Sequence, residues 1–329
     1  MKKLINAVEN VLSESLDGFA AAHADIVELG TDRLFVRRKK LRPGKVALLS
    51  GGGSGHEPLH AGFVGRGMLD AACPGQFFTS PTPDQMTAAT AAIDQGSGTL
   101  FIVKNYEGDV MNFEMAADMA GTPVKTVVVD DDVAVEKSTY SLGRRGVAGT
   151  MIVERLVGAA AEQGASLDEC QALGNDVNAR TRSMGVALTS CTVPAAGKPT
   201  FTLGEDEMEM GVGIHGEPGR RRVKLADADA IAAEMMGAIL DDLAPKEGAE
   251  AILLVNGFGG TPAMELYLMC NAANKILAQR KITPVRTLVG SYVTSLEMAG
   301  CSLTVSLVDD RLASLWDSPV HTAALRWGA

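Results

Sequence analysis

Two histidines and one aspartate stand in segments that are suited to acid–base or nucleophilic chemistry. His56 follows the glycine-rich run GGGSG at 51–55, and His215 lies within GVGIHGEPG at 211–219. Asp109 closes a polar segment that follows an apolar run. A neutral imidazole can act as a base near neutral pH or as a nucleophile toward a carbonyl group. A carboxylate can orient an imidazole or accept a hydroxyl proton, so these three residues are the candidate catalytic groups.

The glycine-rich run does not match the common phosphate-binding motifs. Read from Gly51, the dinucleotide-binding pattern G-x-G-x-x-G would need glycine where His56 stands. A P-loop would need Gly-Lys-Ser/Thr at its end, and a nucleophile elbow around Ser54 again meets His56 at its last position. A tight turn with a surface histidine is the alternative. The glycines directly follow a short apolar strand at 46–49, which favours a ligand site.

The other histidines do not form a recognisable metal site. The stretch HEPLH at 56–60 has a proline where a metal-binding helix would have to run. His60 and His321 lack the glycine context and are interpreted as structural, and His23 as an ordinary surface residue.

An acidic run at 130–132 follows another apolar segment and allows two interpretations. Three aspartates could hold Mg²⁺. The favoured interpretation is that they cap helices and position loops, with the GRRG turn at 143–146 steadying them.

Composition restricts the class of protein. The chain has 329 residues, of which 46% are hydrophobic and 36 are glycine, as is typical of an α/β enzyme with a sizeable core. A net charge of −10 makes nucleic acid and anionic membranes poor partners. No apolar run reaches the length of a membrane span, about 18 residues or more. Acidic residues interrupt the segment after the N-terminal lysines, and the five cysteines are scattered, so we expect a cytoplasmic protein with reduced thiols.

The first half of the chain repeats a strand, a polar loop and a helix. The strands are expected at 46–49, 99–103 and 124–129, with a further short strand at 32–36. Helices are expected at 5–19, 83–96, 111–120, 150–163 and 166–179. Cys73-Pro74-Gly75 is expected to break regular structure. This recurrence predicts an α/β fold with mainly parallel strands and the loops gathered at one edge.

We place a domain boundary near Arg182, which gives domains at 1–182 and 183–329. The second is expected to be a smaller mixed α/β domain that carries His215. Its elements are strands at 201–203, 207–213, 251–255, 285–289 and 303–308, and helices at 226–243, at 263–280 and after Asp309.

Eight motifs, in order along the whole chain, resemble those of the substrate-binding subunits of dihydroxyacetone kinases, the DhaK or DAK1 family. They lie at 51–58, 78–83, 104–109, 129–135, 143–146, 192–199, 211–219 and 316–322. Departures are modest: the segment after Gly219 is short, and Ser318 and Ala323 differ from the commonest family residues. The resemblance implies two α/β domains, the first a three-layer, mainly parallel sheet and the second mixed, with a DegV-like fold.

The resemblance also implies residue roles. The histidine matching His215 attacks the ketone of dihydroxyacetone through Nε2 and holds it as a covalent hemiaminal, which selects short ketones over glycerol. The residues matching His56 and Asp109 bind the substrate hydroxyls and assist proton removal. Further residues line the pocket: Gly53, Ser54, Gly55 and Lys104.

The phosphate donor is expected on another chain. Phosphoryl transfer needs cations around the moving phosphate, and this acidic chain has no P-loop. Fused kinases of the family continue into a helical nucleotide-binding domain, whereas this chain stops at Ala329. The resemblance therefore implies a stand-alone subunit with no cofactor on this chain. A DhaL-type partner carries ADP or ATP with Mg²⁺, and a DhaM-type phosphocarrier recharges it from phosphoenolpyruvate. The resemblance also implies that the subunit is a homodimer.

Three alternatives remain open. The substrate could be another small ketose such as erythrulose, or the kinase could be a two-chain enzyme that uses free ATP. Some proteins of this kind act as transcriptional coactivators instead. Retention of Asp109 and His215 argues against that last alternative.

Overall fold

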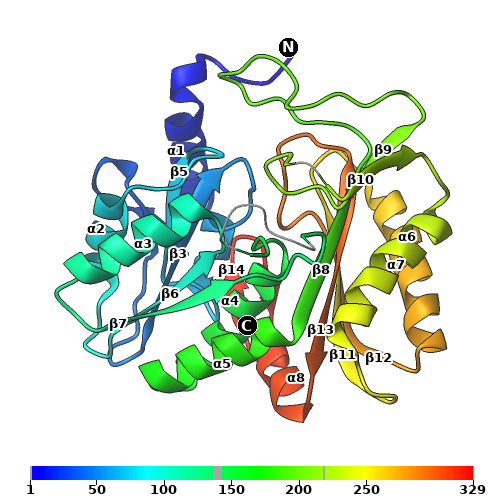
Figure 1. Cartoon of the computed structure of the whole chain (residues 1–329). Helices are drawn as coiled ribbons and strands as arrows, with labels where there is room; N and C mark the ends of the chain where they lie inside the picture. The colour runs from blue at the N-terminus through cyan, green and yellow to red at the C-terminus, as the bar shows by residue number, and fades with distance from the viewer. Residues whose placement is uncertain (1, 136–142, 218, 329) are drawn as a thin grey trace.

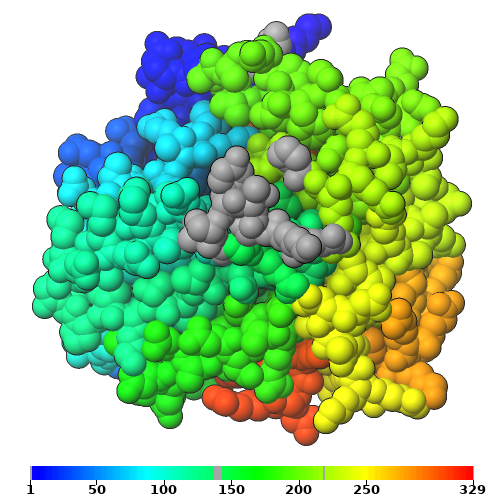
Figure 2. Space-filling model, viewed as in Figure 1, coloured from blue at the N-terminus to red at the C-terminus, as the bar shows by residue number. Residues whose placement is uncertain are grey.

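The computed structural model, which describes residues 2–135, 143–217 and 219–328, contains two six-stranded sheets and a small third sheet (Figure 1). The first sheet has the order β1-β2-β5-β3-β6-β7 and the second the order β10-β9-β8-β13-β11-β12. In Figure 1 the first sheet and helices α2 and α3 form one half of the molecule, and the second sheet with α6 and α7 forms the other. The space-filling view shows the two halves meeting across the face that is drawn (Figure 2).

The first sheet is mainly parallel, as the sequence predicted. Its strands are β1 (Val27–Leu29), β2 (Val36–Arg38), β3 (Ala47–Ser54), β5 (Ala71–Phe77), β6 (Thr99–Lys104) and β7 (Val124–Val129). Strands β5, β3, β6 and β7 pair in parallel, while β1 and β2 form an antiparallel edge. β3 and β6 are buried along their whole length, which is typical of a parallel sheet covered on both faces.

Alternation along these strands divides the side chains between two helical layers. The helices are α1 (Val11–Ala22), α2 (Pro83–Ile93), α3 (Glu107–Met119), α4 (Gly149–Glu162) and α5 (Leu167–Ala179). Leu49 and Phe101 pack in the cluster of α2 and α3, whereas Leu48 and Leu100 pack in the cluster that includes α4. The first half is therefore a three-layer α/β structure.

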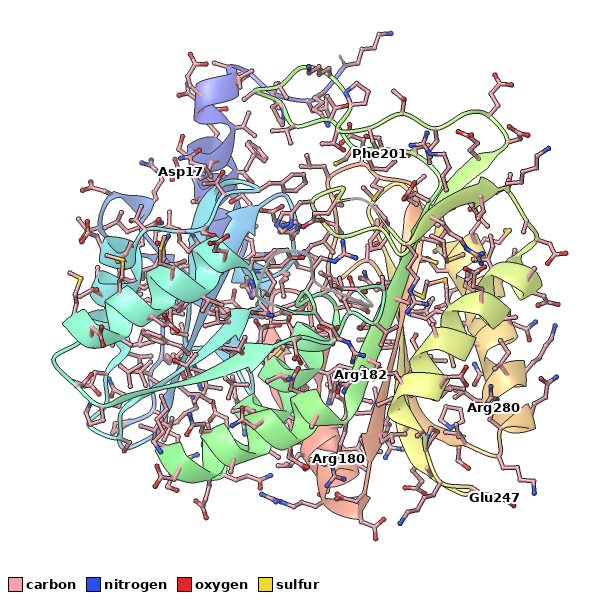
Figure 3. All side chains as sticks on the ribbon, in the orientation of Figure 1. Asp17, Arg180, Arg182, Phe201, Glu247 and Arg280 are labelled. Carbon is pink, nitrogen blue, oxygen red and sulfur yellow. The ribbon has the colours of Figure 1, made fainter. Side chains whose placement is uncertain are left out.

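The second sheet is mixed. Its strands are β8 (Thr181–Ala187), β9 (Glu207–Met210), β10 (Arg221–Lys224), β11 (Glu250–Gly257), β12 (Thr283–Gly290) and β13 (Gly300–Val308). Only β11 and β12 pair in parallel. Its helices are α6 (Ala228–Leu243) and α7 (Ala263–Gln279), and Arg182, labelled at the start of β8 in Figure 3, joins α6 through a 2.5 Å ion pair with Asp242.

The chain then returns to the first half. After α8 (Asp310–Asp317), the short strand β14 (Val320–Thr322) pairs with β15 (Arg326–Trp327) and with β4 (Gly65–Arg66). Buried Arg155 of α4 holds this tail by donating to the carbonyl of Trp316 at 2.7 Å. The second large sheet begins with β8 at residue 181, close to the predicted boundary, but the C-terminal tail pairs with the first half. The division into domains at 182 therefore stays a prediction.

Several sequence-based expectations were wrong in detail. The glycines at 51–53 belong to β3 rather than to a turn, and Cys73-Pro74-Gly75 continues β5 instead of breaking it. Pro74 is tolerated because β2 pairs with β5 only as far as Ala72, so that side of β5 has no ladder bond to lose.

Other boundaries also differ. The segment 201–203, where Figure 3 labels Phe201, forms no strand. The strand expected at 32–36 is replaced in part by a 3₁₀ turn (Thr31–Arg33) before β2. The first helix, α1, begins at Val11 rather than at residue 5. The short segment after Gly219 is strand β10 rather than a direct passage into helix. Helix α3 begins at Glu107, so Asp109 lies in its first turn and not in a loop. A 3₁₀ turn at Val8–Asn10 precedes α1, and another at Ala61–Phe63 precedes β4. Pro218 of the second histidine motif lies outside the described residues.

Within the part of the chain that the structure describes, no helix has the length and apolar character needed to cross a bilayer.

Candidate functional site

The structure brings the two glycine-flanked histidines together. His56 follows β3 of the first half, and His215 lies in the loop after β9 of the second half. Their ring centroids are 4.6 Å apart, with the ring planes at 81°. Tyr106 and Phe78 complete the wall, with ring centroids 4.7 and 5.2 Å from that of His215. The site therefore lies where the carboxyl end of β3 meets the second half.

His56 is a buried, neutral imidazole with one nitrogen available. Its side chain stacks on Phe78, and Nδ1 donates to the carbonyl of Thr294 at 2.7 Å. Burial first, and then the charges of His215 and Lys104, lower the pKa of His56 well below its usual value of 6.5. Because Nδ1 carries the proton, Nε2 is an acceptor, and it has no hydrogen-bond partner among the described residues.

This burial predicts a measurable pH dependence of stability. The unfolded chain protonates His56 below about pH 6.5 and the folded chain does not, so the stability that His56 contributes is lost as the pH falls. Relative to His56→Gln, the free energy of unfolding of the wild type should decrease by about 1.4 kcal/mol per pH unit below 6.5. Urea unfolding of both proteins at several pH values measures this difference, and a constant difference would contradict a buried neutral histidine.

His215 is held by a carboxylate from its own loop. Its Nδ1 lies 2.7 Å from Oε1 of Glu217, and its backbone N–H donates to Oε2 of the same residue at 2.9 Å. Burial alone would raise the pKa of Glu217, but His215 and Arg145 outweigh it and lower the value to about 2. An ionised Glu217 keeps the imidazole proton on Nδ1, so Nε2 carries the lone pair.

Glycine is required in the His215 loop because the Glu217 carboxylate lies directly against the loop backbone. A Cβ atom on Gly213 would lie 2.0 Å from Oε2 of Glu217 and 2.7 Å from Nη1 of Arg145. Gly216 has φ = 79°, a conformation that favours glycine, and its N–H closes the turn on the carbonyl of Gly213. The glycines thus let the carboxylate fold back onto His215.

The third candidate, Asp109, pairs with Lys104, whose charge acts on His56. Both side chains are buried, and Lys104 Nζ lies 3.3 Å from Oδ2 of Asp109 and 3.2 Å from the carbonyl of Gly51. Gly52 makes room for the ammonium group, because a Cβ atom there would lie 2.1 Å from Nζ. Lys104 is thereby the counter-ion of the candidate base.

The remaining predicted pocket residues belong to the end of β3 and its turn. Gly53 packs against the backbone of Phe78 and Thr79, where a Cβ atom would clash at 2.5 Å. Ser54 donates to the carbonyl of Gly75 at 2.7 Å, and Gly55 has φ = 110°. These residues shape the wall beneath His56.

Two cavities border the site. One, of about 380 Å³, is lined by Phe201, Glu209, Gly216, Glu217 and Arg222 and borders the loop of His215. The other, of about 310 Å³, lies between α1 and the glycine strand and includes neither catalytic histidine among its lining residues. The first cavity shares Glu217 with the histidine pair, and the second shares Gly53 and Ser54 with the glycine strand.

The acidic run is used structurally. Asp131 accepts from the backbone N–H groups of Val147 and Gly149 at the start of α4, at 2.8 and 2.7 Å. Asp132 accepts from Arg145 Nε at 2.8 Å. Among the described residues there is no cluster of histidine, cysteine, aspartate or glutamate side chains suited to a metal ion.

Sequence reasoning did not single out Glu217, Tyr106 or Thr294. Glu217 had a signal, since His-Gly-Glu-Pro resembles His56-Glu57-Pro58. The two glutamates differ in use, because Glu57 accepts from the N–H of Gly55 at 3.0 Å rather than from a histidine ring. Thr294 accepts from the ring of His56 through its backbone carbonyl group, a contact that no side-chain pattern reveals.

Comparisons with known proteins agree over the whole chain. Residues 17–324 match the Dak1 domain family. The chain is 51% identical over 328 residues to a protein of Listeria innocua named "PTS-dependent dihydroxyacetone kinase 1, dihydroxyacetone-binding subunit DhaK", covering 98% of this chain and all of that one. It is 49% identical over 356 residues to the corresponding PEP-dependent subunit of Escherichia coli, covering both chains fully.

A solved structure has the same fold. "Dihydroxyacetone kinase operon co-activator Dha-DhaQ" superposes with a TM-score of 0.90 at 33% identity, over 94% of this chain and 97% of that one.

Proposed function

Because the chain belongs to the Dak1 family, we propose that it is the dihydroxyacetone-binding subunit of a phosphoenolpyruvate-dependent dihydroxyacetone kinase. The two relatives of about 50% identity, which it matches over their full length, are kinase subunits, and the chain is accordingly a component of a phosphotransferase. The observation that carries the proposal for the site is the unpartnered Nε2 of buried His56, next to the ring of His215. A ligand hydroxyl would satisfy that acceptor.

In the proposed reaction, Nε2 of His215 attacks the carbonyl carbon of dihydroxyacetone. A C–N bond forms as the C=O π bond breaks, and the imidazole passes its Nδ1 proton to Glu217. The oxygen takes one proton from water and Glu217 returns its proton to the solvent, so that no net proton is gained or lost. Glycerol has no carbonyl group and cannot be captured in this way. The product of this step is a neutral hemiaminal with both substrate hydroxyl groups intact.

The second step transfers phosphate to one of these hydroxyls. His56 Nε2 accepts a hydrogen bond from a hydroxyl, and Asp109 takes the proton of the hydroxyl that attacks phosphorus, giving dihydroxyacetone phosphate. The buried hydroxyl of Tyr106, also unpartnered among the described residues, supplies another polar contact. Lys104 Nζ lies 3.3 Å from Oδ2 of Asp109 and orients its carboxyl group.

The phosphate comes from a partner in this proposal. A DhaL-type subunit carries the nucleotide and Mg²⁺, and a DhaM-type phosphocarrier supplies it. The acidic chain lacks a P-loop of its own, which supports a donor on a separate chain. A cytoplasmic homodimer completes the proposal.

Carbon NMR with dihydroxyacetone labelled at its carbonyl tests the capture step. We expect the bound signal to move from the ketone region to that of a tetrahedral carbon, and this signal to be absent in His215→Ala. A bound signal that stays a ketone in the wild type would overturn covalent capture. It would favour a second candidate function, ligand-dependent coactivation, which the co-activator of the same fold suggests. Binding of erythrulose but not dihydroxyacetone would identify another ketose as substrate.

A further inference from the structure

A buried chain of polar side chains runs away from Asp109 beneath the glycine strand. It consists of Lys104 on β6, His60 in the turn before β4, and Glu154 in the middle of α4. His60 Nε2 lies 2.9 Å from Lys104 Nζ, and His60 Nδ1 lies 2.6 Å from Oε1 of Glu154. Lys104 and Glu154 have no solvent-exposed surface, and His60 is 6% exposed. Buried polar groups of this kind are costly unless each has a partner.

The hydrogen bonds of Lys104 define the first step. An ammonium group has three N–H donors and no lone pair. Three acceptors surround Nζ: the carbonyl of Gly51, Oδ2 of Asp109 and Nε2 of His60. Nζ hydrogen-bonds Gly51 and His60 and forms an ion pair with Asp109, and because an ammonium group has no lone pair, Nε2 of His60 must be an acceptor.

The proton of His60 is consequently on Nδ1. A second contact supports this assignment. Ser50 Oγ donates its single proton to the carbonyl of Ile102 at 2.6 Å. Ser50 Oγ can therefore only accept from Nδ1 of His60, which lies 3.0 Å away. Burial and the charge of Lys104 lower the pKa of His60 well below 6.5, which agrees with a neutral ring. Nδ1–H then points at Ser50 and Glu154.

Glu154 acts as an acceptor without needing a charge. Burial raises its pKa to about 8 against the lowering effect of Lys104, so the carboxyl group is largely protonated near neutral pH. Oε1 accepts from His60, and Oε2 has no partner among the described residues. A carboxyl oxygen at this position fixes the tautomer of His60.

We propose that Glu154 and His60 are positioning residues for catalysis: Glu154 fixes the tautomer of His60, His60 fixes the ammonium group of Lys104, and Lys104 holds Asp109 as an oriented carboxylate. This inference rests on the proposed role of Asp109 as the base. Displacement of a catalytic base by about 1 Å can lower the reaction rate on the order of 100-fold. Control of the position of Asp109 therefore matters even when it is exerted through a chain of hydrogen-bonded residues. His60, interpreted as purely structural from sequence, thus acts on the site.

The tautomer of His60 is the direct test, and it needs no activity. In protein labelled with ¹⁵N at its five histidines, the His60 signals are those missing from His60→Gln. Near neutral pH the ring should show protonated Nδ1 and unprotonated Nε2. A ring protonated on Nε2, or on both nitrogens, would overturn the proposal, because Lys104 could not donate to it.

A matched pair of variants at Glu154 separates positioning from packing. Glu154→Gln keeps an acceptor oxygen and should leave the turnover of the complete kinase within about twofold of the wild type. Glu154→Met has a similar length but no acceptor, and should lower kcat by about 10-fold or more. Both should still form the hemiaminal, which also shows that they are folded. Equal turnover in the two variants, whether high or low, would contradict the proposal.

Failure of the proposed function would look different. Full turnover of Asp109→Asn would remove Asp109 as the base, whereas the tautomer of His60 would be unaffected by that result.

Discussion

Replacement of Asp109 by asparagine is expected to lower the turnover of the reconstituted kinase by about 10² to 10⁴-fold, the usual contribution of general base catalysis. The amide cannot take the proton of the attacking hydroxyl. Its shape is close to that of the carboxylate, and Lys104 can still donate to its oxygen, so the fold should remain. The decrease should appear in kcat, measured as formation of dihydroxyacetone phosphate with saturating partner subunits.

The hemiaminal separates loss of the base from loss of the pocket. Asp109→Asn should still give the tetrahedral carbon signal, because His215 and Glu217 lie on the other half of the molecule. Asp118→Asn, a change on the exposed face of the same helix α3, is the matched control and should leave turnover unchanged. Full activity of Asp109→Asn would show that another group accepts the proton.

The parallel half of the fold could be predicted because its strands are long apolar runs. Residues 100–103 are an uninterrupted apolar run, as expected for β6, which is buried along its whole length. Residues 124–129 include Lys125 and Thr126 and form the partly exposed edge strand β7, where Val127 and Val129 are buried. The extent of β3 could not be predicted, because a run of glycines usually indicates a turn. In this strand the absence of side chains lets neighbouring groups lie close to the backbone. The ammonium group of Lys104 lies against Gly52, and the backbone of Phe78 and Thr79 lies against Gly53.

The candidate site was predictable in its titratable groups but not in their partners. His56, Asp109 and His215 stand out because few segments combine glycine with a charged or titratable side chain. Glu154 gave a weaker signal, as a charged residue within the apolar helix α4. Its partner His60 lies 94 residues earlier in the chain, and only the packing of α4 against the first sheet brings the two together.

Replacement of Gly213 by alanine is expected to abolish hemiaminal formation without unfolding the protein. The new Cβ atom would lie 2.0 Å from Oε2 of Glu217, so the carboxylate must move. His215 would then lose the acceptor of its Nδ1 proton and the bond to its backbone N–H. The backbone of Gly213 has no positive φ, so the effect comes from the side chain of Glu217 and not from backbone strain.

The carbonyl-labelled substrate and urea unfolding measure the two consequences separately. We expect no tetrahedral carbon signal and a decrease in unfolding free energy of about 1 to 3 kcal/mol, the usual cost of overpacking. Gly237→Ala is the control: a Cβ atom there meets nothing within 4 Å, and it lies inside helix α6, where alanine is favoured over glycine by about 1 kcal/mol. That variant should form the hemiaminal and be slightly more stable. If Gly213→Ala also formed the hemiaminal in full, the contact between Glu217 and His215 would not be required for capture, and the nucleophile would have to be activated by another group.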